Sequence, residues 1–110
     1  MKLELIFAIL ILHWIGDFVF QDDTTAKKKA DSITWLFIHC GLYTILLMSL
    51  KDANAMWVIF NGLAHFIIDL ITSKINKRLW NKGDRHNFFV CIGFDQMLHY
   101  MILIYTWKWF

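Results

Sequence analysis

The chain has 110 residues, of which 58% are hydrophobic, 17% aromatic and 18% charged, with no proline and a formal net charge of +2. Soluble domains are usually about 45–50% apolar and about 25% charged, so this composition indicates a chain that resides in lipid, and the small charge does not indicate nucleic acid as a partner. Disorder, a second domain and a disulfide scaffold are excluded by the apolar content, the length and the presence of only two cysteines.

Four apolar segments are each long enough to cross a hydrocarbon core about 30 Å thick, which takes roughly 20 helical residues. They are residues 3–21, 32–50, 53–73 and 86–107, and short polar segments separate them. None shows the strict alternation of a barrel strand or the charged outer face of a helix in a soluble bundle. The sequence therefore predicts an all-α, integral-membrane four-helix bundle with up-down-up-down topology, formed as a single transmembrane domain over residues 1–110.

Lysine and arginine are concentrated in the first and third connections. Residues 22–31 and 74–85 hold eight of them, whereas the opposite side of the bundle holds three. Because basic loops tend to stay in the cytoplasm, we expect both connections on the cytoplasmic side of the inner membrane and both termini outside. The expected partner is the bilayer, and four short spans are also compatible with a homo-oligomer.

The first two spans each carry polar side chains on one helical face. In the first span, His13, Asp17 and Gln21 follow one another at intervals of four residues. Residues four apart lie nearly one above another on a helix, so these three form a single polar stripe. The second span has His39 and, one turn further on, Tyr43.

The last two spans repeat this arrangement. The third span carries Asn61, His65, Asp69 and Ser73, and the fourth carries Asp95, Gln96 and His99. Counted from the expected cytoplasmic ends, the four histidines and three aspartates of the spans fall in one layer, about 6–18 Å deep at about 1.5 Å per residue. We therefore expect them to meet in one buried cluster.

A short internal similarity relates the first span to the third. Residues 13–18 read HWIGDF and residues 65–70 read HFIIDL, at an offset of 52 positions, close to half the chain. Such an offset favours two related helical hairpins.

Ionised carboxylates are costly in a bilayer, at about 2.5–3.5 kcal/mol or more each, and therefore need partners. Protonation or pairing with histidine is one solution, and a divalent metal bound by imidazole and carboxylate is the other. Seven ligands are more than one four-coordinate ion needs and about right for two ions that share a bridging aspartate, so one or two ions are expected. The candidate ligands are His13, Asp17, His39, His65, Asp69, Asp95 and His99. For this donor set zinc is the first expectation, followed by manganese or iron.

Other polar residues are candidates for supporting roles. Hydrogen bonds to the ligands, or contacts with a substrate, are expected from Gln21, Tyr43, Ser73 and Gln96. Contacts with phosphate or anionic lipid are expected from Lys27, Lys28, Lys29 and Arg85.

Three motifs resemble those of a family of small bacterial and phage membrane proteins of unknown function. They are His13-Trp14-x-Gly16-Asp17-Phe18, His65-x-x-x-Asp69 and Asp95-Gln96-x-x-His99, and the resemblance extends over nearly the whole chain. It implies a polar intramembrane site. In combining several spans with histidine and aspartate, the chain is also similar to proteins described as membrane-bound metal-dependent hydrolases.

The sequence leaves three functions open, and whether the protein is an enzyme is open with them. The first is a metal-dependent hydrolase that acts on a phosphoester or lipid-linked substrate in the cytoplasmic half of the bilayer, with Asp17 or Asp95 as the catalytic base. The second is a cation or proton transporter lined by the same residues. The third is a phage or bacterial membrane interaction protein in which the metal is a structural clamp.

Overall fold

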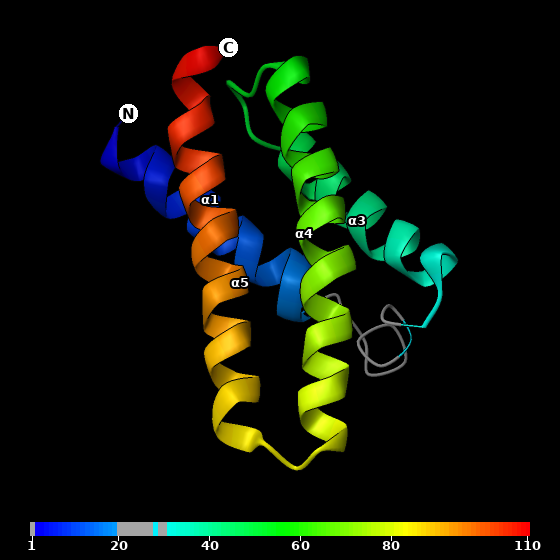
Figure 1. The fold of residues 1–110 in the computed structure, drawn as a ribbon. Helices are drawn as coiled ribbons and strands as arrows, with labels where there is room; N and C mark the ends of the chain where they lie inside the picture. Colours follow the sequence, from blue (N-terminus) through cyan, green and yellow to red (C-terminus); the bar gives the residue numbers. More distant parts are fainter. Residues whose placement is uncertain (1, 20–27, 29–30) are drawn as a thin grey trace.

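The computed structural model describes residues 2–19, 28 and 31–110, and these residues form an all-α fold (Figure 1). The elements in chain order are α1 (Leu3–Trp14), the π-helical segment η1 (Ile15–Val19), α3 (Ile33–Met48), α4 (Ala55–Asn81), α5 (Arg85–Thr106) and the 3-10 turn η2 (Trp107–Trp109). In the described part of the chain, the four α-helices pack compactly, with a radius of gyration of 14.0 Å. The predicted fold class is confirmed at this level.

The helices are less regularly arranged than a bundle of four parallel rods. In Figure 1, α4 and α5 run antiparallel and side by side, and the chain direction alternates from each helix to the next, as expected. However, α1 and α3 lie behind this hairpin and run obliquely to it. The closest packing joins α4 to α5 on one side and to α3 on the other, while η1 reaches α3.

Helix α4 is longer than the sequence predicts. It continues through residues 74–81, for which the sequence predicts a cytoplasmic loop, and ends at Asn81. Charge marks the end of an apolar span but does not end a helix, and lysine, arginine and leucine favour helix. The helix ends where Gly83 adopts a φ of 77°, a left-handed conformation that glycine tolerates best.

The next helix begins directly after this glycine. Asp84 caps α5 by accepting hydrogen bonds from the backbone N–H of Asn87, at 3.2 Å, and from its side-chain amide, at 2.8 Å. These two hydrogen bonds hold the pKa of Asp84 below its usual value. The turn between α4 and α5 therefore occupies only residues 82–84.

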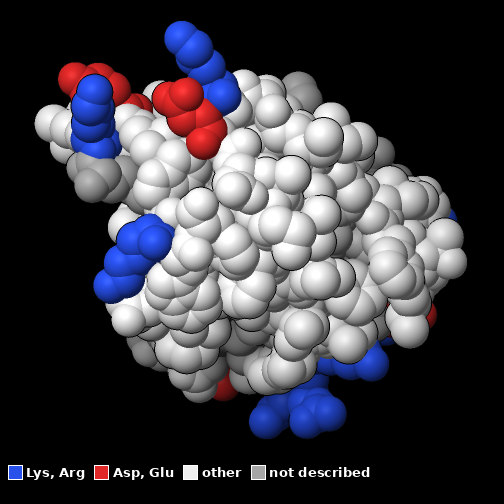
Figure 2. Space-filling model, turned by 90° about the horizontal axis from the view of Figure 1, so that it is seen from above, with Lys and Arg blue, Asp and Glu red and all other residues white. Residues whose placement is uncertain are grey.

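The described helices bury polar side chains and expose apolar ones. On α4, Asn61, His65 and Asp69 are at most 3% exposed, whereas Leu63 and Ile67 are 61% and 57% exposed. Figure 2 shows the molecule from above, where the surface is uncharged apart from a few charged side chains toward its edge. Two helical stretches, Ala55–Asn81 and Arg85–Trp109, are long and apolar enough to cross a membrane, and Ile33–Met48 is a shorter apolar helix.

One group of buried apolar residues lies at the end of the fold where the two chain termini are found. This apolar core consists of Ile9, Tyr43, Leu47, Leu50, Trp57, Val58 and Leu103. The indole N–H of Trp57 donates to the carbonyl oxygen of Leu103 at 3.2 Å, which ties α4 to α5. Helices α3 and α4 approach closely at Gly62, where an added Cβ would lie 2.4 Å from the hydroxyl oxygen of Thr44.

Candidate metal centre

The structure brings together the seven histidines and aspartates that the sequence singled out. All are buried, with no residue more than 6% exposed, and each of the four helical segments contributes at least one. This His/Asp cluster consists of His13, Asp17, His39, His65, Asp69, Asp95 and His99. Their convergence is as expected, whereas their role as metal ligands stays a prediction.

A local change in helix geometry positions the first aspartate. His13 lies in the last turn of α1, and Asp17 lies in the π-helical segment η1 that continues it. A π-helical turn is wider than an α-turn and often occurs at functional sites. Here the Nε2 of His13 and the Oδ2 of Asp17 are 3.5 Å apart, and Asp17 also faces α3 and α4. The sequence carries no signal that we could have used to predict this segment.

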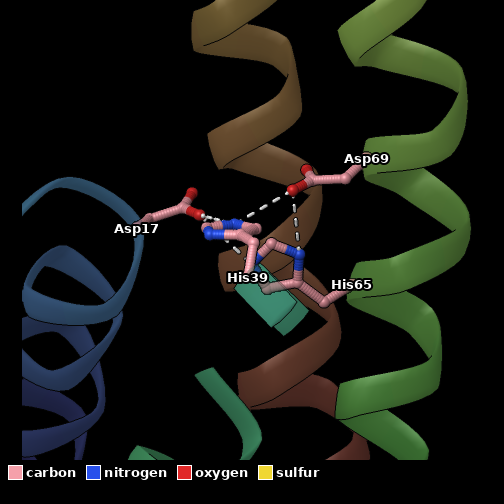
Figure 3. A group of neighbouring side chains, drawn as sticks. All are labelled: Asp17, His39, His65 and Asp69. Atoms are coloured by element: carbon pink, nitrogen blue, oxygen red, sulfur yellow. Dashed lines mark hydrogen bonds and ion pairs between the residues drawn. The ribbon is translucent and has the colours of Figure 1, made fainter. Parts of the chain in front are cut away.

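Four residues form the tightest group, with ligand atoms all within 4.8 Å of one another (Figure 3). His39 on α3 points its Nε2 at both carboxylates, 2.9 Å from Asp17 and 3.1 Å from Asp69. His65 on α4 places its Nε2 3.2 Å from Asp17 and its Nδ1 3.3 Å from Asp69. Nitrogen and oxygen ligands about 2 Å from one tetrahedral ion would lie about 3.3 Å from each other, so these spacings fit a metal.

Two further groups share residues with the first. One consists of His13, Asp17 and His99, and the other of Asp69, Asp95 and His99. His99 on α5 lies with its Nδ1 3.4 Å from Asp95 and its Nε2 3.7 Å from Asp69. The three groups together contain all seven members of the His/Asp cluster.

If the imidazole rings are neutral, their N–H groups are too few to donate a hydrogen bond from every nitrogen that faces a carboxylate. A neutral imidazole carries one N–H, yet both nitrogens of His65 and both nitrogens of His99 face carboxylates. Both ring nitrogens of His99 are buried and make no hydrogen bond to any described residue, and the Nε2 of His39, which carries at most one proton, faces two carboxylates. Buried polar atoms are rarely left unsatisfied, so the cluster needs further protons on its rings or a bound cation. A divalent cation with affinity for nitrogen and oxygen would meet this need.

Gln96 and Tyr43 form hydrogen bonds with members of the His/Asp cluster. The Nε2 of His13 donates to the carbonyl oxygen of Gln96 at 2.6 Å, and its Nδ1 lies 3.1 Å from the Tyr43 hydroxyl. The amide nitrogen of Gln96 donates to Asp17 at 2.7 Å and to Asp95 at 3.1 Å. One side chain of α5 therefore joins three members of the His/Asp cluster.

Two supporting residues were missed. Thr72 donates its hydroxyl to Asp95 at 2.6 Å, and the Cys40 sulfur lies 3.9 Å from the Nδ1 of His65. Thr72 follows Asp69 by three residues, a spacing that also shares a helix face, so spacings of three as well as four would have found it. Cys40 directly follows His39, and only the packing of α3 against α4 brings it to the cluster.

The other predicted supporting residues do not reach the His/Asp cluster or cannot be placed. Ser73 is buried one turn beyond Asp69. Lys28 is exposed and lies over the ring of Trp35, 5.1 Å from its centroid. Arg85 stacks on Trp80 at 3.4 Å and lies ten residues before Asp95, about 15 Å along α5. Gln21, Lys27 and Lys29 lie outside the described residues.

The fold and the site define an all-α protein with a buried cluster of histidine and aspartate that could hold a metal. The chain belongs to DUF3307, a protein family of unknown function that matches residues 5–110. The expectation of a family of unknown function is thereby confirmed. No curated protein and no solved structure matches the chain. The expectations of zinc, hydrolysis and a phage source stay predictions.

Proposed function

We propose that this protein is an integral-membrane, metal-dependent hydrolase that cleaves a phosphoester of a lipid or lipid-linked substrate. The observation that carries the proposal is the His/Asp cluster, in which more buried imidazole nitrogens face carboxylates than neutral rings have protons to bond. Proteins seldom retain so many buried ionisable groups without a function for them. Zinc is the first candidate for the ion, with manganese or iron next.

Membrane insertion is supported by the inverted distribution of side chains. The apolar part of α4, residues 55–73, is about 28 Å long at about 1.5 Å per residue, close to the thickness of a hydrocarbon core. Beyond it comes a basic end formed by Lys74, Lys77, Arg78, Lys82 and Arg85, all exposed. Because basic segments tend to stay in the cytoplasm, we place this end inside the cell and both termini outside.

The two candidate bases, Asp17 and Asp95, differ in how well they are placed to accept a proton from a metal-bound water. A bound divalent ion would supply a water whose pKa is lowered toward about 7. Asp95 lies outside the tightest group and is oriented by Thr72 and Gln96, so it is the better placed of the two candidate bases to accept a proton. Asp17 instead directs both carboxylate oxygens at other members of the cluster.

An apolar groove beside the cluster supports a lipid substrate. It has a volume of about 850 Å³ and lies between α4 and α5, with Phe60, Ala64, Met97 and Met101 among its walls. Gln96 lines the same groove and hydrogen-bonds to Asp17, so the groove and the cluster share a wall. An acyl chain in this groove would hold its phosphoester near the cluster.

The two ends of the cluster differ in a way that favours hydrolysis over transport. Toward the basic end, the Ser73 hydroxyl and the Asn76 carbonyl oxygen are buried without a hydrogen-bond partner among the described residues, as expected of a path that holds water. Toward the opposite end lies the apolar core, and the polar side chains there, Trp57, Asn61 and Thr106, are already hydrogen-bonded to protein groups. A transport pathway would need polar groups available to the ion on both sides.

The test combines metal analysis with an assay. Protein purified in detergent without chelator should contain a divalent metal and release phosphate or alcohol from phosphatidic acid or a p-nitrophenyl phosphoester. His65→Ala should lose both properties, whereas His86→Ala, which removes an exposed histidine of α5, should keep both.

Three outcomes would contradict the proposal. Absence of metal from the wild type would remove the centre altogether. A wild type that binds metal but hydrolyses nothing, together with a lower stability of His65→Ala, would indicate that the metal is a structural clamp. Ion flux in proteoliposomes without product would indicate transport.

A further inference from the structure

We infer that the His/Asp cluster holds two divalent ions side by side, bridged by the carboxylates of Asp17 and Asp69. This inference rests on the proposed metal centre and specifies its number of ions and the ligands of each. It follows from the direction in which each carboxylate oxygen points, from the unbonded ring nitrogens and from the balance of buried charge.

Asp17 divides its two oxygens between two sets of histidines. Its Oδ1 lies 2.9 Å from His39 and 3.2 Å from His65. Its Oδ2 lies 3.5 Å from the Nε2 of His13. A carboxylate whose oxygens face different nitrogen donors is suited to bridge two ions.

Asp69 divides its oxygens in the same way. Its Oδ2 lies 3.1 Å from His39 and 3.3 Å from His65, and its Oδ1 lies 3.7 Å from His99. Two sites follow: site A, with His39 and His65, and site B, with His13 and His99. Site A faces one oxygen of each aspartate, whereas in site B the other oxygen of Asp17 faces His13 and the other oxygen of Asp69 faces His99.

The two histidine pairs have similar separations. The ring centroids are 5.0 Å apart in site A and 5.3 Å apart in site B. His65 of site A and His99 of site B are neighbours, with centroids 4.1 Å apart, so the two sites adjoin. Ions in paired sites of this kind are typically about 3.5–4 Å apart.

Site B is supported by an observation independent of the carboxylates. Both ring nitrogens of His99 are buried, face into the cluster and make no hydrogen bond to a described residue, and the side chain is 3% exposed. The other ligand, His13, has its Nδ1 3.1 Å from the Tyr43 hydroxyl. An Nδ1–H that donates to this oxygen would leave Nε2 to bind the ion, as is usual for metal-binding histidines.

The charge balance also favours two ions. Asp17, Asp69 and Asp95 together carry three negative charges when ionised, and each forms ion pairs with histidines of the cluster. With all four histidines neutral, as metal ligands are, one divalent ion would leave a net charge of −1 in the cluster, which would repel a phosphate. Two would leave +1, which an anionic phosphoester neutralises on binding. Uncompensated buried charge is costly, so the second ion both completes the site and attracts the substrate.

The two sites should fill in order. Site A has four residues with ligand atoms within 4.8 Å of one another, whereas site B requires His13 to release the 2.6 Å hydrogen bond from its Nε2 to Gln96. The first Mn²⁺ added to metal-free protein should therefore bind more tightly than the second.

The experiment is a Mn²⁺ titration of the full chain in detergent, followed by electron paramagnetic resonance and elemental analysis. The wild type should bind two ions in two phases, and its spectrum should change from that of an isolated ion to that of an exchange-coupled pair. His99→Ala should bind one ion, with the isolated spectrum only. His86→Ala serves as the matched control and should bind two.

The wild-type titration decides the question even where a variant fails to fold. One uncoupled ion per active wild-type molecule would overturn the two-ion inference and leave the hydrolase proposal standing. Two ions with no exchange coupling would overturn the bridging by Asp17 and Asp69. Absence of any bound ion would overturn both proposals.

Discussion

The apolar core and the His/Asp cluster are equally buried but are held together by different forces. Trp57 and Leu47 of the core are 1% and 0% exposed, and His65 and Asp69 of the cluster are 0% and 1% exposed. The core is complete in the protein alone, since its side chains need only shape and contact. The cluster instead buries three aspartates among four histidines, and ring protons or a bound cation must balance their charge. Burial by itself therefore does not distinguish packing from function in this fold, whereas unsatisfied polar atoms do.

The largest expected effect is that of a substitution at the centre of the His/Asp cluster, which should remove metal binding and hydrolysis. Asp69→Asn removes the charge of a carboxylate that faces three histidines. We expect loss of bound metal and a fall in hydrolysis of more than about 100-fold, beyond the effect typical of losing a residue that only orients a ligand. Elemental analysis and the phosphoester assay measure both. Metal content equal to that of wild type would contradict the assignment of Asp69 as a ligand.

The matching change in the apolar core should affect stability and leave metal binding intact. Leu47→Ala leaves a cavity and should lower the free energy of unfolding by about 2 kcal/mol, the low end for buried leucines because lipid tails are as apolar as leucine. Denaturant unfolding in detergent measures this loss. Ile45→Ala, on the same helix but 63% exposed, is the control and should change stability little. A loss of metal per folded Leu47→Ala molecule would show that the two regions are coupled.

Gly62 lies where α3 and α4 approach, so a change there should affect both regions. In Gly62→Ala the new Cβ would meet the Thr44 hydroxyl, which must shift or push the helices apart. We expect a loss of about 1–3 kcal/mol in stability and weaker metal binding, because His39 on α3 moves away from its partners on α4.

The clash at Gly62 can be tested by its reversal. Thr44→Ala in the same chain should restore part of both losses, and Gly93→Ala, where an added Cβ meets nothing within 4 Å, should be neutral or slightly stabilising. Unchanged metal affinity in Gly62→Ala, measured by competition with a chelator, would contradict the link between helix approach and the cluster.

The smallest expected effect is at a helix end remote from the cluster. Asn54 caps α4 by accepting a hydrogen bond from the backbone N–H of Met56 at 2.8 Å. Asn54→Ala should cost about 1 kcal/mol of stability, and Asn54→Ser, which keeps a capping oxygen, should cost less. Thermal unfolding with parallel metal analysis measures this effect, and any change in metal content would be unexpected.

Much of the site could be predicted because its residues follow local rules. Apolar length and composition predict the helices, and the spacing of four places His13 with Asp17, and His65 with Asp69, on single faces. The cost of isolated charge in an apolar setting then requires those faces to meet. Helix limits were predicted less well, since residues 74–81 were expected to form a loop and are helical.

The sequence by itself determined which side chains are polar, which face of each helix carries them and that these faces converge, since helical periodicity and the cost of buried charge act along the chain. Only the tertiary structure decided the π-helical turn at Asp17, the oblique packing of α1 and α3, and which carboxylate oxygen faces which histidine. Gln96 and Thr72 likewise acquire their partners through it. These features depend on contacts between residues far apart in sequence, and the orientation of a side chain across a helix interface follows from packing that no local pattern records.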